Sequence, residues 1–146
     1  MSAEIVIANF LRVAGQDLEG AKLLLAGGNR NAAYLCEQAA EKVIRAVPTS
    51  EGKHAGVRHQ LDEMVDAIPD ENPIKPLLAA IQHLAAFATT FRYPSPTGKI
   101  KPPPSGAQVE ADIAKVQEAL SQSTAHFGVD LGKPNEPAAT PGPIRS

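Results

Sequence analysis

The chain has 146 residues and a mass of 15.3 kDa, which suits one ordinary domain rather than two. Its 14 basic and 16 acidic residues leave a formal net charge of −2, so overall charge predicts neither a nucleic-acid coat nor a membrane-surface binder, and any electrostatic site must be local. A single cysteine, Cys36, excludes an intrachain disulfide framework and fits a reducing compartment. No apolar run reaches the length of a membrane span, and no basic region precedes an apolar run at the N-terminus. We therefore expect a soluble, cytoplasmic protein that does not act at a membrane.

Apolar residues recur with helical spacing through the first third of the chain. One stripe spans residues 3–25 and should end at the glycine pair 27–28. A second stripe spans residues 32–47, after Asn29 as a suitable N-cap. We expect it to end at Pro48, because the residue before a proline is disfavoured in a helix. Many residues of both stripes are alanines, which predicts closely packed helices.

The rest of the chain predicts three more helical segments. A short amphipathic stretch runs from Arg58 to Ile68, a fourth helix runs from about Pro73 to Pro94, and the last runs over about residues 106–126. No run of alternating β-branched residues predicts a strand. The pattern predicts an all-α, up-and-down four-helix bundle with one additional short helix.

Proline and glycine mark two segments without regular structure. Seven of the 13 residues from Pro94 to Gly106 are proline or glycine, and helical patterns flank them on both sides, so this is a loop inside the domain. Residues 128–146 contain four prolines and almost no large apolar side chain. We expect them to form a disordered tail behind a domain of residues 1–127.

The second predicted helix carries a row of charged residues spaced four apart. Glu37, Glu41 and Arg45 share one face, with Lys42 beside them. The spacing suits a solvated face on which Glu41 and Arg45 form an ion pair one turn apart. The alternative is that one of these carboxylates is buried against an arginine from another helix, with Arg92 as the candidate. The sequence leaves both interpretations open.

The fourth predicted helix ends in the sequence Phe-Arg-Tyr-Pro. The negative end of the helix dipole and the last carbonyls explain Arg92 by themselves. The functional alternative is that the Arg92 guanidinium and the ring and hydroxyl of Tyr93 receive a phosphate or a base. Lys99 and Lys101 follow, so residues 92–101 carry three positive charges and no negative one.

Other residue types point away from metal or cofactor chemistry. His59 precedes the short amphipathic stretch and could cap, pack, or act as an acid or base. It lies five residues from His54, which is not the spacing of two ligands on one helix face, so we expect no metal site. The sequence contains no P-loop and no nucleophile elbow, and we expect no cofactor. Cys36 lies on an apolar stripe and is expected to be a buried hydrophobe rather than a nucleophile.

Four short segments taken together carry a resemblance to a known family. They are Asp17-Leu18 with Ala21, Ala33 with Cys36-Glu37-Gln38-Ala39-Ala40-Glu41-Lys42, His59-Gln60-Leu61, and Phe91-Arg92-Tyr93-Pro94. Over roughly residues 3–127 the chain resembles the HEPN family, whose name abbreviates higher eukaryotes and prokaryotes nucleotide-binding. The resemblance implies a helical bundle, usually dimeric, that associates with nucleotides or RNA. Many bacterial members stand beside a small nucleotidyltransferase in toxin–antitoxin pairs, and others are metal-independent ribonucleases.

The ribonuclease branch of that family needs an arginine followed, after four to six intervening residues, by a histidine. After Arg92 these positions are Thr97, Gly98 and Lys99, and no other arginine of the chain has a histidine at that distance. The resemblance therefore implies the fold, the dimer and a polar site more strongly than RNA cleavage.

Three functions follow from these observations. The first is a non-catalytic homodimer that binds a nucleotide or a phosphorylated ligand and acts with a nucleotidyltransferase. Its binding residues would be Arg92, Tyr93, His59, Glu41, Lys42 and Arg45. The second is a divergent ribonuclease toxin that uses His59 or Tyr93 as its acid or base. The third is a bundle that only pairs with another protein through an apolar helix face.

Overall fold

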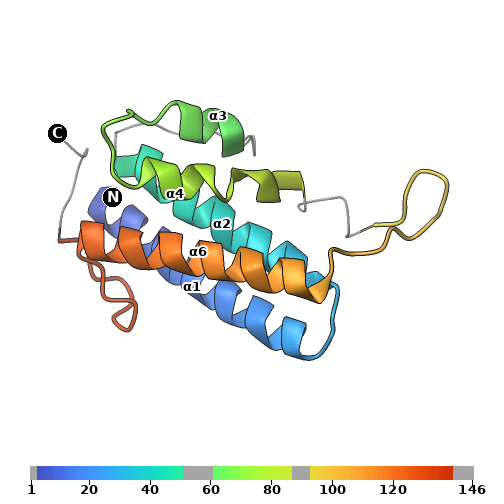
Figure 1. The fold of residues 1–146 in the computed structure, drawn as a ribbon. Coiled ribbons are helices and arrows are strands. Elements are labelled where there is room, and N and C mark those ends of the chain that lie inside the picture. The colour runs from blue at the N-terminus through green and yellow to red at the C-terminus, as the bar shows by residue number, and fades with distance from the viewer. Residues whose placement is uncertain (1–2, 51–60, 87–92, 140–146) are drawn as a thin grey trace.

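The computed structural model describes residues 3–50, 61–86 and 93–139, and these residues form five α-helices, one 3-10 helix and no strand. Helix α1 (Ala3–Ala26) and helix α2 (Asn31–Ser50) make a hairpin in which α2 lies along α1 (Figure 1). The predicted all-α bundle is confirmed.

The remaining helices enclose α2. Helix α6 (Gly106–Phe127) packs against α1 and α2. Helices α3 (Leu61–Asp66) and α4 (Lys75–Ala79), with the 3-10 helix η1 (Gln82–Ala86), also pack on α2, on the side away from α1 in Figure 1. In the part of the chain that is described, no helix combines the length and the apolar character needed to cross a bilayer.

The turn between α1 and α2 forms as its residues predict. Gly28 has a φ of +69°, a left-handed conformation that glycine adopts without a steric penalty. The amides of Gly28 and Asn29 donate to Leu25 and Leu24 at the end of α1. The Asn29 side chain then accepts from the Asn31 amide at 2.8 Å, which confirms its capping role at the start of α2.

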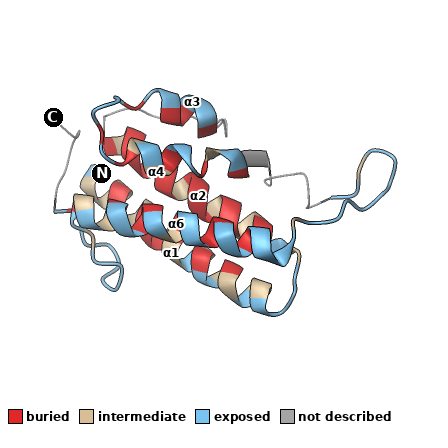
Figure 2. Cartoon of the chain, in the orientation of Figure 1, coloured by how far each residue is buried: buried red, intermediate tan, exposed pale blue. Residues whose placement is uncertain are grey.

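Small residues let α1 and α2 approach closely. Of the 20 residues of α2, 13 are buried, and five of those are alanines (Figure 2). At Gly20 of α1, an added Cβ would lie 2.9 Å from Leu35 Cδ1 of α2, which is too close for an undisturbed contact. The alanines, together with the glycine at position 20, keep the side chains between α1 and α2 small.

Helix α2 does not end at Pro48 as predicted but continues to Ser50. Proline has no amide hydrogen, so the carbonyl four residues earlier, that of Ile44, lacks its usual helical donor. Two hydroxyls donate to carbonyls of this turn: Thr49 Oγ1 to Arg45 at 2.9 Å and Ser50 Oγ to Val47 at 2.6 Å. These bonds add to the last turn of the helix but do not replace the one that Pro48 removes.

The predicted fourth long helix is replaced, in its described part, by α4 and η1, and residues 87–92 lie outside the described ranges. Leu78, Ile81 and Leu84 are fully buried at spacings of three. A 3-10 helix has three residues per turn, so tighter winding keeps all three on one face. The amides of Ile81 and Leu84 each donate to the carbonyl three residues earlier, as such winding requires.

Two other predicted helices have the buried faces that were expected. Leu61, Val65 and Ile68 are buried in and after α3. Helix α6, predicted over about residues 106–126, buries an apolar stripe from Val109 to Leu120. The Ser105 hydroxyl caps its first turn by accepting from the Gln108 amide at 3.1 Å.

Residues 128–139 differ from the disordered tail that the sequence predicts. They fold back on α1, where Arg12 donates to the carbonyls of Asp130 and Glu136. The Ala138 amide donates to the Glu4 carbonyl at 3.0 Å, and the Ala138 side chain is buried. Hydrogen bonds from a buried arginine to backbone carbonyls supply the order that the composition of this segment does not predict. Residues 140–146 lie outside the described ranges.

Candidate functional site

The charged row of α2 is buried. Glu37 is 1% exposed and Glu41 is 6% exposed, so the interpretation as a solvated face is wrong. The reason is that α1, α6, α3 and η1 together surround α2, which leaves it little free surface. The predicted Glu41–Arg45 pair is present, with Arg45 Nη2 4.0 Å from Glu41 Oε1, the distance of a weak contact.

Burial changes what these carboxylates can do. A carboxylate removed from water needs charged or hydrogen-bonding partners to stay ionised. Glu37 accepts from the Gln38 side chain at 2.8 Å, and Glu41 faces Arg45. The proposed contact with Arg92, and the place of His59, fall on residues outside the described ranges, so both stay predictions.

Lys42 belongs to a different face of α2. Its Nζ contacts Asp17 Oδ2 of α1 at 2.5 Å and Gln38 Oε1 at 3.4 Å. This ion pair joins α1 to α2. The structure therefore brings Glu41 and Arg45 together and directs Lys42 toward α1 instead.

Tyr93 stands at the base of a projecting loop. Its side chain is 63% exposed, and the loop extends away from the bundle before α6 begins (Figure 1). The tip is a turn in which Gly98 has a φ of +81° and the amides of Ser95 and Gly98 each donate at 2.7 Å, to Lys99 and to Ser95. The loop predicted between two helices is thus ordered where it is described.

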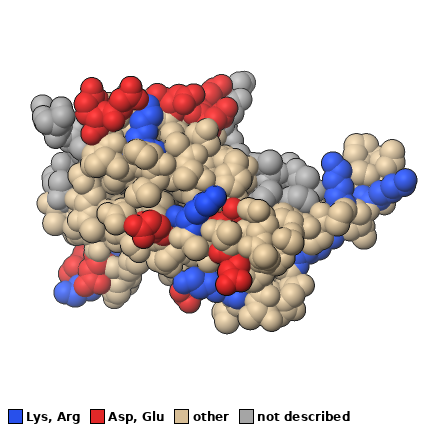
Figure 3. All heavy atoms as spheres, in the orientation of Figure 1, with Lys and Arg blue, Asp and Glu red and all other residues tan. Residues whose placement is uncertain are grey.

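The loop is basic and the opposite edge of the molecule is acidic. Lys99 and Lys101 are the charged residues among 93–105, and Arg30 Nη2 donates to the Lys101 carbonyl at 2.9 Å. Figure 3 shows basic atoms on the loop and acidic atoms gathered over α3, where Asp62, Glu63 and Asp66 lie. An anionic ligand is therefore attracted to the loop end of the bundle.

Sequence analysis missed a pair formed by α6 and η1. Asp112 of α6 is buried, and its Oδ1 accepts from Gln108 Nε2 at 3.0 Å and lies 3.3 Å from His83 Nε2. Asp112 Oδ2 is buried as well and has no hydrogen-bond partner within the described ranges. The His83 side chain is 48% exposed. The buried carboxylate of Asp112 thus lies next to Nε2 of His83, while about half of the His83 side chain is exposed to solvent.

Cys36 is a buried thiol that the carboxylates of Asp112 and Glu37 influence. Burial, followed by the negative charges of Asp112 and Glu37, raises the pKa of the Cys36 thiol to about 12. The thiol is therefore protonated at neutral pH. This confirms the prediction that Cys36 is a buried hydrophobe rather than a nucleophile.

Asp112 and Glu37, the two buried acids, lie on helix faces that are otherwise apolar. Asp112 lies among Val109, Ile113 and Val116 on the buried face of α6, and Glu37 lies one turn from Ala33 and Ala40 on α2. An acidic residue on an apolar helical stripe is the sequence signal that could have found them.

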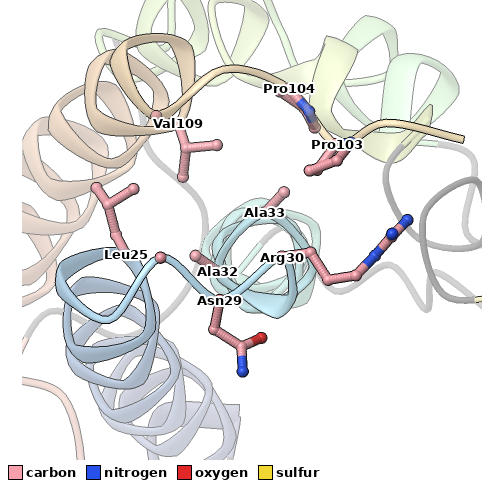
Figure 4. A pocket seen from close by; sticks show the side chains of 10 residues that line it. Leu25, Asn29, Arg30, Ala32, Ala33, Pro103, Pro104 and Val109 are labelled. Carbon is pink, nitrogen blue, oxygen red and sulfur yellow. The ribbon is translucent and has the colours of Figure 1, made fainter.

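A separate pocket of about 210 Å³ lies where α2 and α6 begin. In Figure 4 the side chains of Leu25, Ala33 and Val109 point into it, whereas those of Asn29 and Arg30 point away. Its walls are therefore apolar, and it contains none of the predicted binding residues.

Metal ligation finds no support among the described residues. No group of three or more His, Cys, Asp or Glu side chains is placed there to hold an ion. The expected absence of a metal stays a prediction.

Comparison with known proteins identifies a family for this chain. The family model described as HEPN domain matches residues 7–123, which is most of the chain. No curated protein and no solved structure matches the chain.

Proposed function

The chain belongs to the HEPN domain family, and we propose that it is a non-catalytic member that binds a nucleotide or another phosphorylated ligand. In this proposal the protein is a cytoplasmic homodimer that acts with a nucleotidyltransferase partner in a toxin–antitoxin pair. It supplies a binding surface and no chemistry of its own.

One observation carries the proposal: the loop end of the bundle presents an exposed tyrosine and, on the same loop, positive charge that no acidic residue of the loop neutralises. Tyr93 offers a ring for stacking and a hydroxyl, and Lys99 and Lys101 offer cations for phosphate oxygens. Arg30 fixes the loop backbone at Lys101. Arg92 precedes Tyr93 in the chain and completes the predicted set.

The missing histidine is the reason for proposing binding without cleavage. Thr97, Gly98 and Lys99 occupy the positions after Arg92 at which the ribonuclease branch needs a histidine. A cationic site without a positioned acid or base can hold a phosphodiester, but it has no group to carry out the proton transfers that cleavage requires.

The test is a thermal-shift titration against nucleoside mono- and triphosphates. A ligand at about 100 times its dissociation constant stabilises the folded state by about 2.7 kcal/mol, which is several degrees for a domain of this size. We expect the shift to disappear in Tyr93→Ala and in the double variant Lys99→Ala/Lys101→Ala. Lys115→Ala is the matched control, because it removes an exposed lysine from α6 outside the loop. A shift of the same size in the loop variants, or no shift with any nucleotide in the unmodified protein, would refute the proposal.

A second candidate, metal-independent RNA cleavage, is favoured by the His83–Asp112 pair. Asp112 is placed to orient the imidazole, and His83 is exposed enough to exchange a proton with a 2′-hydroxyl. Incubation of single-stranded RNA with the protein and EDTA tests this. Cleavage that is lost in His83→Gln and retained in His126→Gln would establish it, whereas intact RNA would eliminate it.

A further inference from the structure

The pocket in Figure 4 lies at the base of the projecting loop. Its inner end is formed by core residues, since Ala33 is 1% and Val109 is 4% exposed. Pro103 and Pro104 line one side of it, and they follow Lys101 in the loop. The pocket therefore adjoins the basic segment on which the proposed function depends.

Arg30 connects the pocket to that basic segment. It lines the pocket in the turn before α2, and its Nη2 donates to the Lys101 carbonyl at 2.9 Å. In Figure 4 its side chain is directed away from the cavity. None of the described residues that line the pocket is acidic. Positive charge therefore lies beside the pocket, while the side chains that point into it are uncharged.

The volume of the pocket, about 210 Å³, limits what it can hold. Pockets that enclose most of a drug-sized ligand measure about 300–1,000 Å³. This one is smaller, so it takes a single ring system and leaves the remainder of a ligand outside. The side chains of Leu25, Ala33 and Val109 point into it and offer aliphatic surface to the faces of such a ring. The fitting ligand has an uncharged ring at one end and an anionic group at the other.

We propose that the pocket receives the base of a nucleotide whose phosphate meets Lys99 and Lys101 of the loop. The inference rests on the proposed function and adds the position of the base, while Tyr93 contributes its hydroxyl to the phosphate. The polar side chains of Asn29 and Arg30 point away from the pocket, so no side chain within it reads the edge of the base. Adenine and guanine nucleotides should therefore differ in affinity by less than about tenfold.

The test compares AMP with ribose 5-phosphate, which has the same sugar and phosphate but no base. Isothermal titration calorimetry on the full chain gives both dissociation constants, and their ratio reports the contribution of the base. We expect AMP to bind the unmodified protein at least about tenfold more tightly than ribose 5-phosphate. GMP should bind like AMP.

Gly106→Leu fills the pocket from its exposed rim. An added Cβ at Gly106 would lie 3.9 Å from Leu25 Cδ1, which is an ordinary contact, so the backbone accepts the side chain. The variant should bind AMP no more tightly than ribose 5-phosphate, and its affinity for ribose 5-phosphate should not change. Ala33→Leu fills the pocket from its inner end and should have the same effect.

Ala107→Leu is the matched control. Ala107 is the next residue of α6, is exposed and does not line the pocket. The same kind of substitution there should leave both dissociation constants unaltered. Circular dichroism and the melting temperature establish that each variant is folded.

Four results would overturn the inference. They are equal affinities of AMP and ribose 5-phosphate for the unmodified protein, pocket variants that bind AMP like the parent, an Ala107→Leu protein that loses AMP as strongly, and a preference of more than about tenfold between AMP and GMP. Tyr93→Ala should weaken both compounds alike. If it weakens AMP alone while the pocket variants do not, the base stacks on Tyr93 instead.

Failure of the proposed function gives a different result. If both compounds bind with equal affinity, the binding function stands and the position of the base is refuted. If Gly106→Leu weakens AMP but Lys99→Ala/Lys101→Ala does not, the pocket stands and the phosphate site on the loop is refuted. If neither compound binds, both are refuted.

Discussion

Replacing Arg12 with methionine should release residues 128–139 from α1. Methionine keeps the aliphatic packing of the side chain but has no donors. In the structure Arg12 Nε and Nη2 donate to the Asp130 carbonyl at 3.1 and 3.0 Å, and Nη1 donates to the Glu136 carbonyl at 2.8 Å. The change therefore removes every hydrogen bond from Arg12 to this segment.

The expected loss of stability follows from these contacts. A hydrogen bond from a charged donor contributes about 1.5–3 kcal/mol, and two carbonyls are involved. Part of this is offset, because the released carbonyls meet water and the released segment regains conformational freedom. We expect a net loss of about 2–3 kcal/mol, which lowers the melting temperature of a domain of this size by about 6–9 °C.

Differential scanning calorimetry measures the loss, and limited proteolysis tests its cause. Cleavage after Leu131 by chymotrypsin should accelerate in Arg12→Met. Lys22→Met is the control, since Lys22 is a half-buried residue of the same helix whose contacts, an ion pair with Glu19 at 3.3 Å and a hydrogen bond to Gln117 at 3.0 Å, do not involve residues 128–139. Equal melting temperatures for the two variants would show that Arg12 does not hold the segment.

Three further predictions concern single positions. The Cys36 thiol keeps its proton in the folded state because its pKa is raised to about 12, whereas in the unfolded chain it ionises above its ordinary pKa of 9.0. The free energy of unfolding should therefore fall by about 1.4 kcal/mol per pH unit from pH 9 toward 12. Urea unfolding of Cys36→Ala should lack this pH dependence. Ser105→Ala removes the cap of α6 and should cost about 1 kcal/mol in the same assay. Gly128→Ala should cost more than about 1 kcal/mol by calorimetry, since φ is +62° there and the added Cβ would lie 2.6 Å from Ala139 Cβ.

The long helices could be predicted because local signals and packing agree in them. In α1, α2 and α6 a sustained apolar stripe coincides with a turn or cap residue at one end, as at Gly28 and Ser105. The errors fall where a distant contact decides the outcome. Arg12, for example, orders a segment more than a hundred residues away in sequence. Residue composition and the spacing of apolar residues do not predict such contacts.

The candidate site was harder to predict because a charged residue at helical spacing has two opposite interpretations. Glu41 and Arg45 were correctly paired from their separation, but the same separation occurs on solvated and on buried faces. Burial is set by how many helices surround α2, which is a property of the whole bundle. The acid that spacing alone could have revealed is Asp112, because it interrupts an apolar stripe. Its partner His83 comes from a segment that winds as a 3-10 helix rather than the predicted α-helix, and this difference in winding rotates the side chains about the helix axis. A contact between two elements can be predicted only when the winding of both is known.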